Sequence, residues 1–335
     1  MAQKKNKMTK KITVLGAGLW GSVLANHIAN KGNKVTLWEY DRDLFDKIKK
    51  TGKHPSLEKF KFNKTIILTD SLYKSLADAD AIIVAINSKG IRRLIRKISK
   101  YIKPQTPIIT ASKGLEYKTY FTMSEVIESE LKNKNPVFAI SGPSFAKEVA
   151  VMVPTKLVLA GKTPALLNKL KNYFNGYPLA IETTTDRKAV ELGAALKNVF
   201  AIACGIIDEK FGENTKAAFI TQAMDEMNNI IKSFGGKSKT VYGFSGLGDF
   251  ILTGGSVKSR NTLLGHKLAK GTNLTKAKEQ IKTVTEGINS VKVLNAIVVR
   301  KKINAPIVKS IYNIVYKGKS LENLLKPMGF KDAKK

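Results

Sequence analysis

Residues 11–21 read KITVLGAGLWG, a β-branched run that leads directly into a glycine-rich turn. Gly16, Gly18 and Gly21 have the spacing G-x-G-x-x-G, and LWGSVLANHIANKG (19–32) continues as a helical segment. In such a unit the first glycine permits the tight turn, the second lets a pyrophosphate approach the backbone, and the third lets helix and strand pack closely. The helix N-terminus adds free amides and a positive dipole. The stretch therefore predicts a dinucleotide site at the first turn of a parallel sheet.

Similar apolar runs recur through the first half of the chain, separated by helical segments. Runs that are apolar throughout, rather than alternating, are typical of parallel strands covered on both faces. We therefore predict a Rossmann-like, doubly wound, mostly parallel α/β sheet over residues 11–187, preceded by a flexible basic tail at 1–10. From about Asp186 long helical patterns separated by glycine-rich turns predict an all-helical domain over 188–335. The expected strands are 11–16, 34–39, 65–68, 80–86, 106–112, 136–141, 156–161 and 178–183, and the expected helices are 186–210, 214–234, 260–270, 285–301 and 305–317, with one more element near Gly248.

The composition describes a soluble globular protein with a large excess of positive charge. The chain has 335 residues, of which 58 are Lys or Arg and 26 are Asp or Glu, so its net charge of +32 attracts any anion. Lysines recur along the whole chain, which favours a compositional bias over a dedicated nucleic-acid surface. There is also no interleaved aromatic and basic stripe. We therefore expect no specific nucleic-acid partner.

The cysteine, the histidines and the N-terminal segment exclude further kinds of site and further classes of protein. The single Cys204 excludes an intramolecular disulfide and any cysteine-based zinc site, and the three histidines are scattered, so we expect no metal. The basic N-terminus leads into a strand and a glycine loop rather than into a signal peptide. These features predict a cytoplasmic protein without membrane insertion.

The end of the second expected strand carries an acidic residue. Glu39 lies about where a carboxylate meets an adenosine ribose in dinucleotide folds, and it would favour NAD by repelling a 2′-phosphate. Arg42, three residues on, could accommodate that phosphate. Both NAD and NADP therefore remain possible at this point. The alternative for Glu39 is a solvated carboxylate at a strand end.

A lysine interrupts the apolar segment VELGAALKNVFAIACGIIDE (190–209). Lysine is rarely fully buried, because an unpaired ammonium loses its hydration, so Lys197 needs a compensating partner. At roughly 100° per residue the side of the helix around Lys197 consists of small residues. Such a face leaves room either for a ligand or for a closely packed helix. Cys204 lies on it and is expected to be a small buried hydrophobe. The small residues are Gly193, Ala194, Ala201, Cys204 and Gly205.

Four later segments contain more polar residues and glycines than packing requires: ASKGLE (111–116), ISGPSFAKE (140–148), GFSGLGDF (243–250) and KSRN (258–261). Taken singly, their side chains have ordinary explanations, such as a surface lysine, a helix cap or a solvated charge. The chain nevertheless resembles the bacterial-type NAD(P)-dependent glycerol-3-phosphate dehydrogenases in an ordered series of segments. In chain order these are the glycine loop, ASKGLE, ISGPSFAKE, ELGAALKNV, GENTKAA, GLGDFILT, SRN and TEG. The resemblance runs from about residue 11 to about residue 325.

This resemblance implies reversible reduction of dihydroxyacetone phosphate to sn-glycerol 3-phosphate for phospholipid synthesis, by a homodimer that uses NAD or NADP. Lys197 then matches the proton-transferring lysine. Two departures concern the cofactor: Leu19 replaces a small polar residue, and Tyr40 stands where a basic or imidazole side chain is common. Matching positions imply substrate contacts at Lys113, Gly142, Ser144, Lys197, Asp249, Ser259, Arg260 and Asn261, and cofactor contacts at Gly16, Gly18, Leu19, Trp20, Gly21, Tyr40, Lys113, Ala146, Arg260, Val284 and Glu286.

The residue types suit this chemistry. Reduction of a ketone builds negative charge on its oxygen, which a protonated amine stabilises and then protonates, and a neutral amine reverses the step. Arg260 with Asn261 offers a fork of donors for the substrate phosphate. The nearest rival is another two-domain reductase with a catalytic lysine, of the hydroxyacid dehydrogenase or ketopantoate reductase type, which would lack the SRN and GLGD segments.

Overall fold

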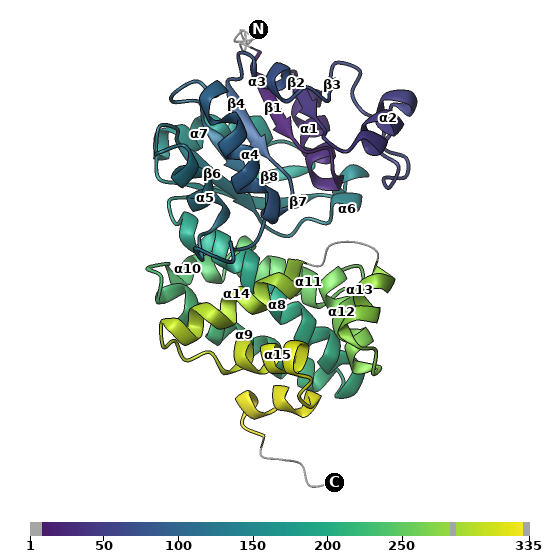
Figure 1. Ribbon diagram of the computed structural model, residues 1–335, viewed down its shortest axis with the longest axis vertical. Coiled ribbons are helices and arrows are strands. Elements are labelled where there is room, and N and C mark those ends of the chain that lie inside the picture. Colours follow the sequence, from purple (N-terminus) through teal and green to yellow (C-terminus); the bar gives the residue numbers. More distant parts are fainter. Residues whose placement is uncertain (1–8, 282–285, 331–335) are drawn as a thin grey trace, which may run out of the picture. The chain divides into compact units, whose positions relative to one another are not determined.

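The computed structural model describes residues 9–281 and 286–330 (Figure 1). The chain divides into two compact units, each with its own hydrophobic core. The first comprises Met1–Ser112, Ser124–Ile140 and Ser144–Thr185, and the second Lys113–Met123, Ser141–Pro143 and Asp186–Lys335. Two short segments that follow strands of the first unit thus cluster with the helices of the second.

The first unit is built on an eight-stranded sheet of order β3-β2-β1-β4-β5-β6-β7-β8. β1 pairs in parallel with β2 and with β4, as in a doubly wound fold, so the prediction of a Rossmann-like sheet is confirmed. Each of the eight expected runs overlaps one strand. Several strands are shorter than expected because their last residues continue into loops, whereas β3, β7 and β8 each extend one residue beyond the expected run. The strands are β1 Lys11–Leu15, β2 Lys34–Trp38, β3 Ile67–Thr69, β4 Ala81–Val84, β5 Ile108–Thr110, β6 Val137–Ser141, β7 Thr155–Gly161 and β8 Leu179–Thr184.

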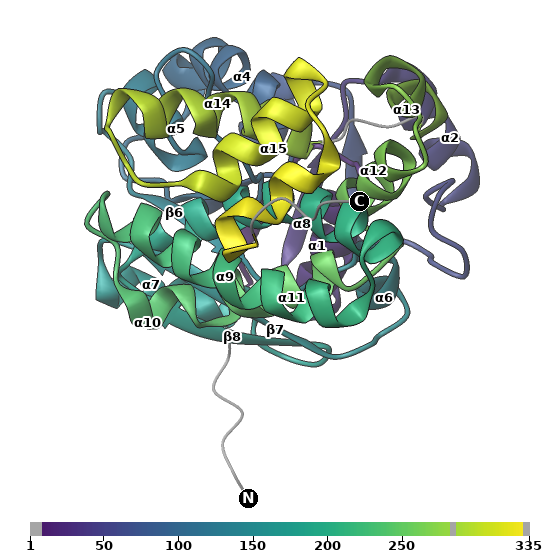
Figure 2. The same cartoon turned by 90° about the horizontal axis from the view of Figure 1, so that it is seen from below.

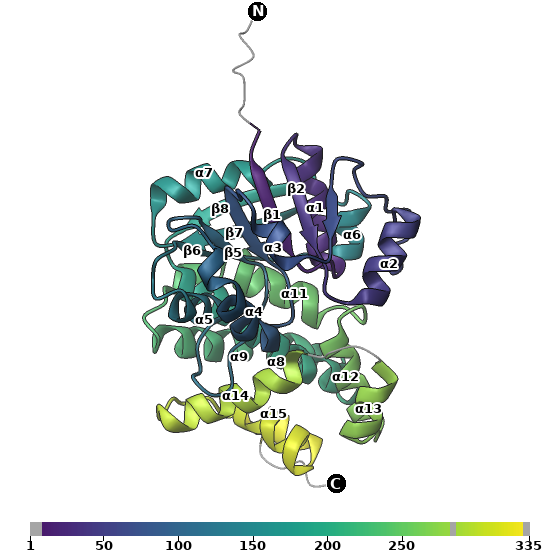
Figure 3. The same ribbon diagram turned by 45° about the horizontal axis from the view of Figure 1, so that its top comes forward.

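Helices cover both faces of this sheet. α1 contacts α6 and α7, whereas α4 and α5 lie on the other side of the strands (Figures 2 and 3). α2 begins after Asp41, whose carboxylate accepts a hydrogen bond from the Leu44 amide, and it ends at Gly52 in the left-handed conformation. The helices are α1 Leu19–Asn30, α2 Arg42–Thr51, α3 Leu72–Leu76, α4 Ile91–Ile98, α5 Met123–Glu130, α6 Ala146–Ala150 and α7 Pro164–Phe174.

The second unit is helical, as predicted. Of its longer helices only α13 was not expected, because this short polar segment buries just Ala277 and Ile281 and so has little apolar periodicity. The elements are α8 Arg187–Lys210, α9 Glu213–Lys232, α10 Ser238–Val241, a π-helical turn Phe244–Gly248, α11 Asp249–Gly254, α12 Arg260–Ala269, α13 Leu274–Ile281, α14 Glu286–Arg300 and α15 Pro306–Lys317, followed by 3-10 turns at Leu321–Leu324 and Lys326–Met328.

α8 is the central helix of this unit, surrounded by α9, α11, α12, α14 and α15 (Figure 1). Every residue from Ala189 to Ile207 is buried. In the described part of the chain, α8 alone has the length and hydropathy to cross a membrane, and its apolar window lies entirely inside the protein. A core helix of a soluble protein has these same properties.

Two of the small residues of α8, Gly205 and Gly193, lie against the backbone of neighbouring elements. A Cβ built on Gly205 would lie 2.0 Å from the Thr262 carbonyl oxygen of α12, and one on Gly193 would lie 3.1 Å from the Ser245 carbonyl oxygen. The alternative of room for a ligand is therefore wrong at these two positions. Cys204 is fully buried, and burial raises the pKa of its thiol to about 12, which confirms the small buried hydrophobe.

Candidate functional site

The three glycine positions of the first turn require glycine for different reasons. Gly16 has φ +109°, and a Cβ there would lie 2.8 Å from the Ala85 carbonyl oxygen; a Cβ on Gly21 would lie 2.0 Å from the Gly16 carbonyl oxygen. The fold itself therefore requires these two glycines. Gly18 has an ordinary φ of −62°, and nothing lies within 4 Å of its missing Cβ. Space left open at the N-terminus of a helix fits the close approach of a pyrophosphate.

The other predicted cofactor residues of the first unit lie on three segments: the start of α1, the end of β2 and the start of α6. Gly18 is the N-cap of α1 and makes no side-chain capping bond, Leu19 is 37% exposed, and Trp20 packs partly against the core. Tyr40, directly after Glu39, is 70% exposed. Ala146 begins α6, which packs against α1. Val284 lies outside the described residues.

Glu39 holds the end of β2 to the glycine loop. Its side chain is only 3% exposed, and its Oε2 accepts a hydrogen bond from the Ala17 amide at 2.7 Å. Its Oε1 accepts from the Tyr40 and Asp41 amides at 2.8 and 2.9 Å. The alternative of a solvated carboxylate is therefore wrong, because three backbone donors replace the water.

The second unit contains a buried cluster around Lys197. Its Nζ donates to Asp249 Oδ1 and to Thr253 Oγ1, both at 2.8 Å. The other oxygen of Asp249 accepts from Lys113 Nζ at 2.7 Å, and that ammonium also lies 3.4 Å from the Gly142 carbonyl oxygen. One carboxylate thus lies between two ammonium groups. The partner that the buried lysine requires is Asp249, delivered by the first turn of α11.

The charged groups of this cluster shift one another's pKa values. Burial would raise the pKa of Asp249, but the ammonium groups of Lys113 and Lys197 outweigh it and hold the pKa below its usual value. Burial lowers the pKa of Lys197 to about 8; Asp249 opposes this shift, while Lys113 adds to it. An amine with that pKa exchanges a proton readily near neutral pH, as a general acid and base must.

The start of α12 brings three predicted residues to the same unit. The Ser259 hydroxyl caps the helix by accepting from the Thr262 amide at 3.3 Å. Asn261 donates to Asn198 Oδ1 at 2.9 Å and accepts from the Gly287 amide at 3.0 Å. Arg260 is exposed between them. Ser259 and Asn261 are thus buried and held by the protein, and Arg260 is the most exposed of the three.

Glu286 begins α14 in the same electrostatic environment. Burial raises the pKa of its carboxyl, and the positive charges of Arg260, Lys113 and Lys197 act in the opposite direction. Ser144, in contrast, belongs to the first unit, between β6 and α6. Among the described residues no group of His, Cys, Asp and Glu side chains could hold a metal ion.

Two residues of the cluster were missed from the sequence. Thr253 lies one helical turn after Asp249 in GLGDFILT, so its spacing alone places both on one face of α11. Asn198 directly follows Lys197, and its link to Asn261 depends on the crossing of α8 with α12. Helical spacing would have found the threonine, but not the asparagine.

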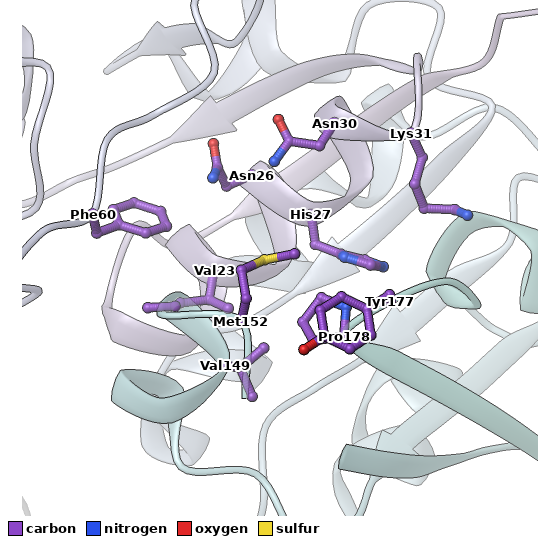
Figure 4. A pocket seen from close by; sticks show the side chains of 11 residues that line it. Val23, Asn26, His27, Asn30, Lys31, Phe60, Val149, Met152, Tyr177 and Pro178 are labelled. Atoms are coloured by element: carbon purple, nitrogen blue, oxygen red, sulfur yellow. The ribbon is translucent and has the colours of Figure 1, made fainter. Parts of the chain in front are cut away.

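A separate hollow of about 470 Å³, open solvent included, lies beside α1 in the first unit (Figure 4). Its polar side chains are held by the surrounding chain. His27 Nε2 lies 2.5 Å from the Phe174 carbonyl oxygen, Asn26 accepts from the Asn63 amide, and Lys31 donates to the Asn175 carbonyl oxygen. It therefore offers less chemistry than the cluster around Lys197.

Known proteins match the chain over almost its whole length. The N-terminal and C-terminal descriptions of the NAD-dependent glycerol-3-phosphate dehydrogenase family match residues 11–167 and 186–326. A glycerol-3-phosphate dehydrogenase of Fusobacterium nucleatum, named for NAD(P)+, is 36% identical over 97% of this chain and 98% of its own. The crystal structure of the Coxiella burnetii glycerol-3-phosphate dehydrogenase is 32% identical, with a TM-score of 0.91 over 96% of this chain and 99% of that one. A ketopantoate reductase from Ralstonia eutropha, 15% identical with a TM-score of 0.59 over 91% of this chain and 97% of its own, shares only the fold.

Proposed function

This chain belongs to the NAD(P)-dependent glycerol-3-phosphate dehydrogenase family, and from that premise we propose that Lys197 transfers the proton when dihydroxyacetone phosphate and sn-glycerol 3-phosphate are interconverted. The observation that carries the proposal is the buried ammonium of Lys197, bound to Asp249 and Thr253 and with its pKa lowered to about 8. A cofactor bound at the glycine loop supplies or accepts the hydride.

The protein's own part of the reaction is the proton and the developing charge. In the reducing direction the Lys197 ammonium stabilises the negative charge that grows on the C2 oxygen, and then protonates it. In the oxidising direction the neutral amine removes the hydroxyl proton. Asp249 and Thr253 orient the amine, because each already binds its Nζ. The same carboxylate and the Lys113 ammonium are proposed to contact the substrate.

The substrate phosphate is proposed to bind at the start of α12. Arg260 has an exposed guanidinium there, and the helix N-terminus adds a favourable dipole. Ser259 retains a hydroxyl proton, and Asn261 retains one amide proton, after the hydrogen bonds that hold them. Gly142 and Ser144, in the ISGPSF turn, are proposed to add further contacts.

Arg260→Lys is expected to raise KM for dihydroxyacetone phosphate by roughly 10-fold, because a lysine cannot bind a phosphate with two parallel hydrogen bonds. The effect on kcat should be smaller. Steady-state kinetics with the cofactor saturating measure both parameters, and Lys210→Arg, at the exposed end of α8, serves as a control for a neutral exchange of the two cations. An unchanged KM in the Arg260 variant would remove this residue from the phosphate site.

The two directions of the reaction are expected to depend on pH in opposite ways. Since the pKa of Lys197 is lowered to about 8, the neutral amine accumulates above that pH and the ammonium below it. For glycerol 3-phosphate oxidation kcat/KM should rise through pH 8, and for ketone reduction it should fall. Asp249→Asn should move both inflections to lower pH, whereas Lys113→Met, which removes a like charge, should move them higher. If neither substitution shifts the pH of the inflections in kcat/KM, the result would contradict the role of Lys197.

Gly18→Ala is expected to separate cofactor binding from folding. The backbone at Gly18 suits alanine and nothing lies within 4 Å of the added Cβ, so the free energy of unfolding should stay within about 0.5 kcal/mol of the wild type. The methyl group would stand where the pyrophosphate approaches, so the Kd of NADH should rise by roughly 10-fold or more. Fluorescence titration and urea unfolding give the two numbers. Equal cofactor affinity would show that the open space at Gly18 is not part of the site.

Turnover of dihydroxyacetone phosphate compared with 2-keto acids tests the function as a whole. The enzyme should reduce the phosphorylated ketone with NADH or NADPH and leave ketopantoate and related 2-keto acids nearly untouched. Preference for a 2-keto acid would support the rival reductases, which share the fold but not this cluster of segments.

The cellular setting follows from the family and the fold. We propose a cytoplasmic homodimer that takes a small phosphorylated substrate and supplies glycerol 3-phosphate for phospholipid synthesis. The burial of the apolar window of α8 supports a protein without membrane insertion. The spread of lysines along the chain supports the absence of a specific nucleic-acid partner.

A further inference from the structure

The end of β2 has a local charge opposite to that of the chain. Residues 39–46 read EYDRDLFD, four carboxylates and one guanidinium, in a chain in which basic residues outnumber acidic residues by 58 to 26. A lysine-rich composition would by itself place cations here as elsewhere. The acidic segment follows β2, which pairs in parallel with β1, the strand that leads into the glycine loop. In a dinucleotide fold the adenosine ribose binds at this end of the second strand.

Glu39 fixes one of these charges against the loop. Its Oε2 binds the Ala17 amide at 2.7 Å, one residue before Gly18, and its Oε1 binds two further amides. A carboxylate has about four acceptor positions, so three are filled and one remains on Oε2. A ribose hydroxyl can donate to that position. A 2′-phosphate has no proton to donate when ionised, and it meets a negative charge that three backbone donors hold in place.

The nearby cation does not offset this charge. Arg42 binds Asp70 and also lies 3.3 Å from Asp46, so it has two carboxylate partners. Each of these exposed pairs is weak on its own. Their sum still leaves the segment negative, and a 2′-phosphate would have to compete with both carboxylates for one guanidinium. Tyr40, 70% exposed, adds no charge beside them.

We propose that this enzyme selects NAD(H) over NADP(H), with Glu39 as the residue that determines the choice. The inference rests on the proposed function for the identity of the reaction, but the selectivity is a property of cofactor binding and is measurable without turnover. Repulsion between the fixed carboxylate and a 2′-phosphate a few ångströms away corresponds to roughly a 10-fold or greater difference in affinity.

Fluorescence titration of the full-length protein with NADH and with NADPH tests the proposal directly. The wild type should bind NADH at least about 10-fold more tightly. Glu39→Gln removes the charge and keeps the side-chain size. It should lower the ratio of the Kd of NADPH to the Kd of NADH by roughly 10-fold. Asp225→Asn, which removes an exposed carboxylate on α9, is the charge-matched control and should leave the ratio unchanged.

A second variant tests the same charge effect without changing the Glu39 side chain, which binds the glycine loop. Tyr40→Arg changes an exposed side chain and adds a cation beside the ribose position, so it should tighten NADPH binding and lower the ratio of the Kd of NADPH to the Kd of NADH. Equal or tighter binding of NADPH by the wild type would overturn the proposal, as would a ratio that neither variant changes. Selective NADH binding without reduction of dihydroxyacetone phosphate would instead support the selectivity and count against the proposed function.

Discussion

Lys197→Ala is expected to lower kcat for dihydroxyacetone phosphate reduction by about 100-fold or more, because it removes the only group proposed to protonate the C2 oxygen. The loss should be similar in the oxidising direction, where the amine accepts the proton. Binding of NADH should persist, since the glycine loop belongs to the other unit of the chain. Stopped-flow and steady-state rates, together with a cofactor titration, separate these effects.

Two further substitutions make this test specific. Lys197→Arg keeps a positive charge but cannot release a proton at these pH values, so oxidation should remain as slow as in the alanine variant. Lys210→Ala removes a lysine from the exposed end of the same helix and should leave the rate unchanged. Near-normal turnover of Lys197→Ala would assign the proton transfer to another group.

Gly205→Ala is expected to destabilise the protein by about 3 kcal/mol or more, at the upper end of the usual cost of overpacking. The added Cβ would lie 2.0 Å from the Thr262 carbonyl oxygen, so α8 and α12 would have to separate. Urea unfolding measures the loss. Because Asn261 and Arg260 also lie on α12, any folded fraction should bind the substrate less tightly.

The matched control for this prediction is Gly18→Ala, which adds the same methyl group at a position with nothing within 4 Å. It should leave the unfolding free energy almost unchanged. A Gly205→Ala protein as stable as the wild type would mean that the two helices do not pack as closely as their backbone contact indicates.

Much of the architecture was predictable from the chain. The strand of residues 11–15 and the glycine spacing indicated a dinucleotide fold, because Gly16 and Gly21 meet local backbone demands that sequence spacing reflects. The eight apolar runs predicted the sheet, since parallel strands buried on both faces are apolar throughout. The polar helix α13 was not predicted, because it buries too few residues to leave a periodic signal.

The sequence by itself also marked Lys197 as a buried charge in need of a partner, and the ordered segments pointed to Asp249, Lys113 and Arg260. Only the tertiary structure decided which atoms meet. Asp249 lies between two ammonium groups, Asn198 accepts from Asn261, and Gly205 and Gly193 of α8 meet the backbones of Thr262 and Ser245 rather than a ligand. The physical reason is that one-dimensional spacing specifies the face of a helix, whereas the partner of that face depends on contacts between residues far apart in the chain.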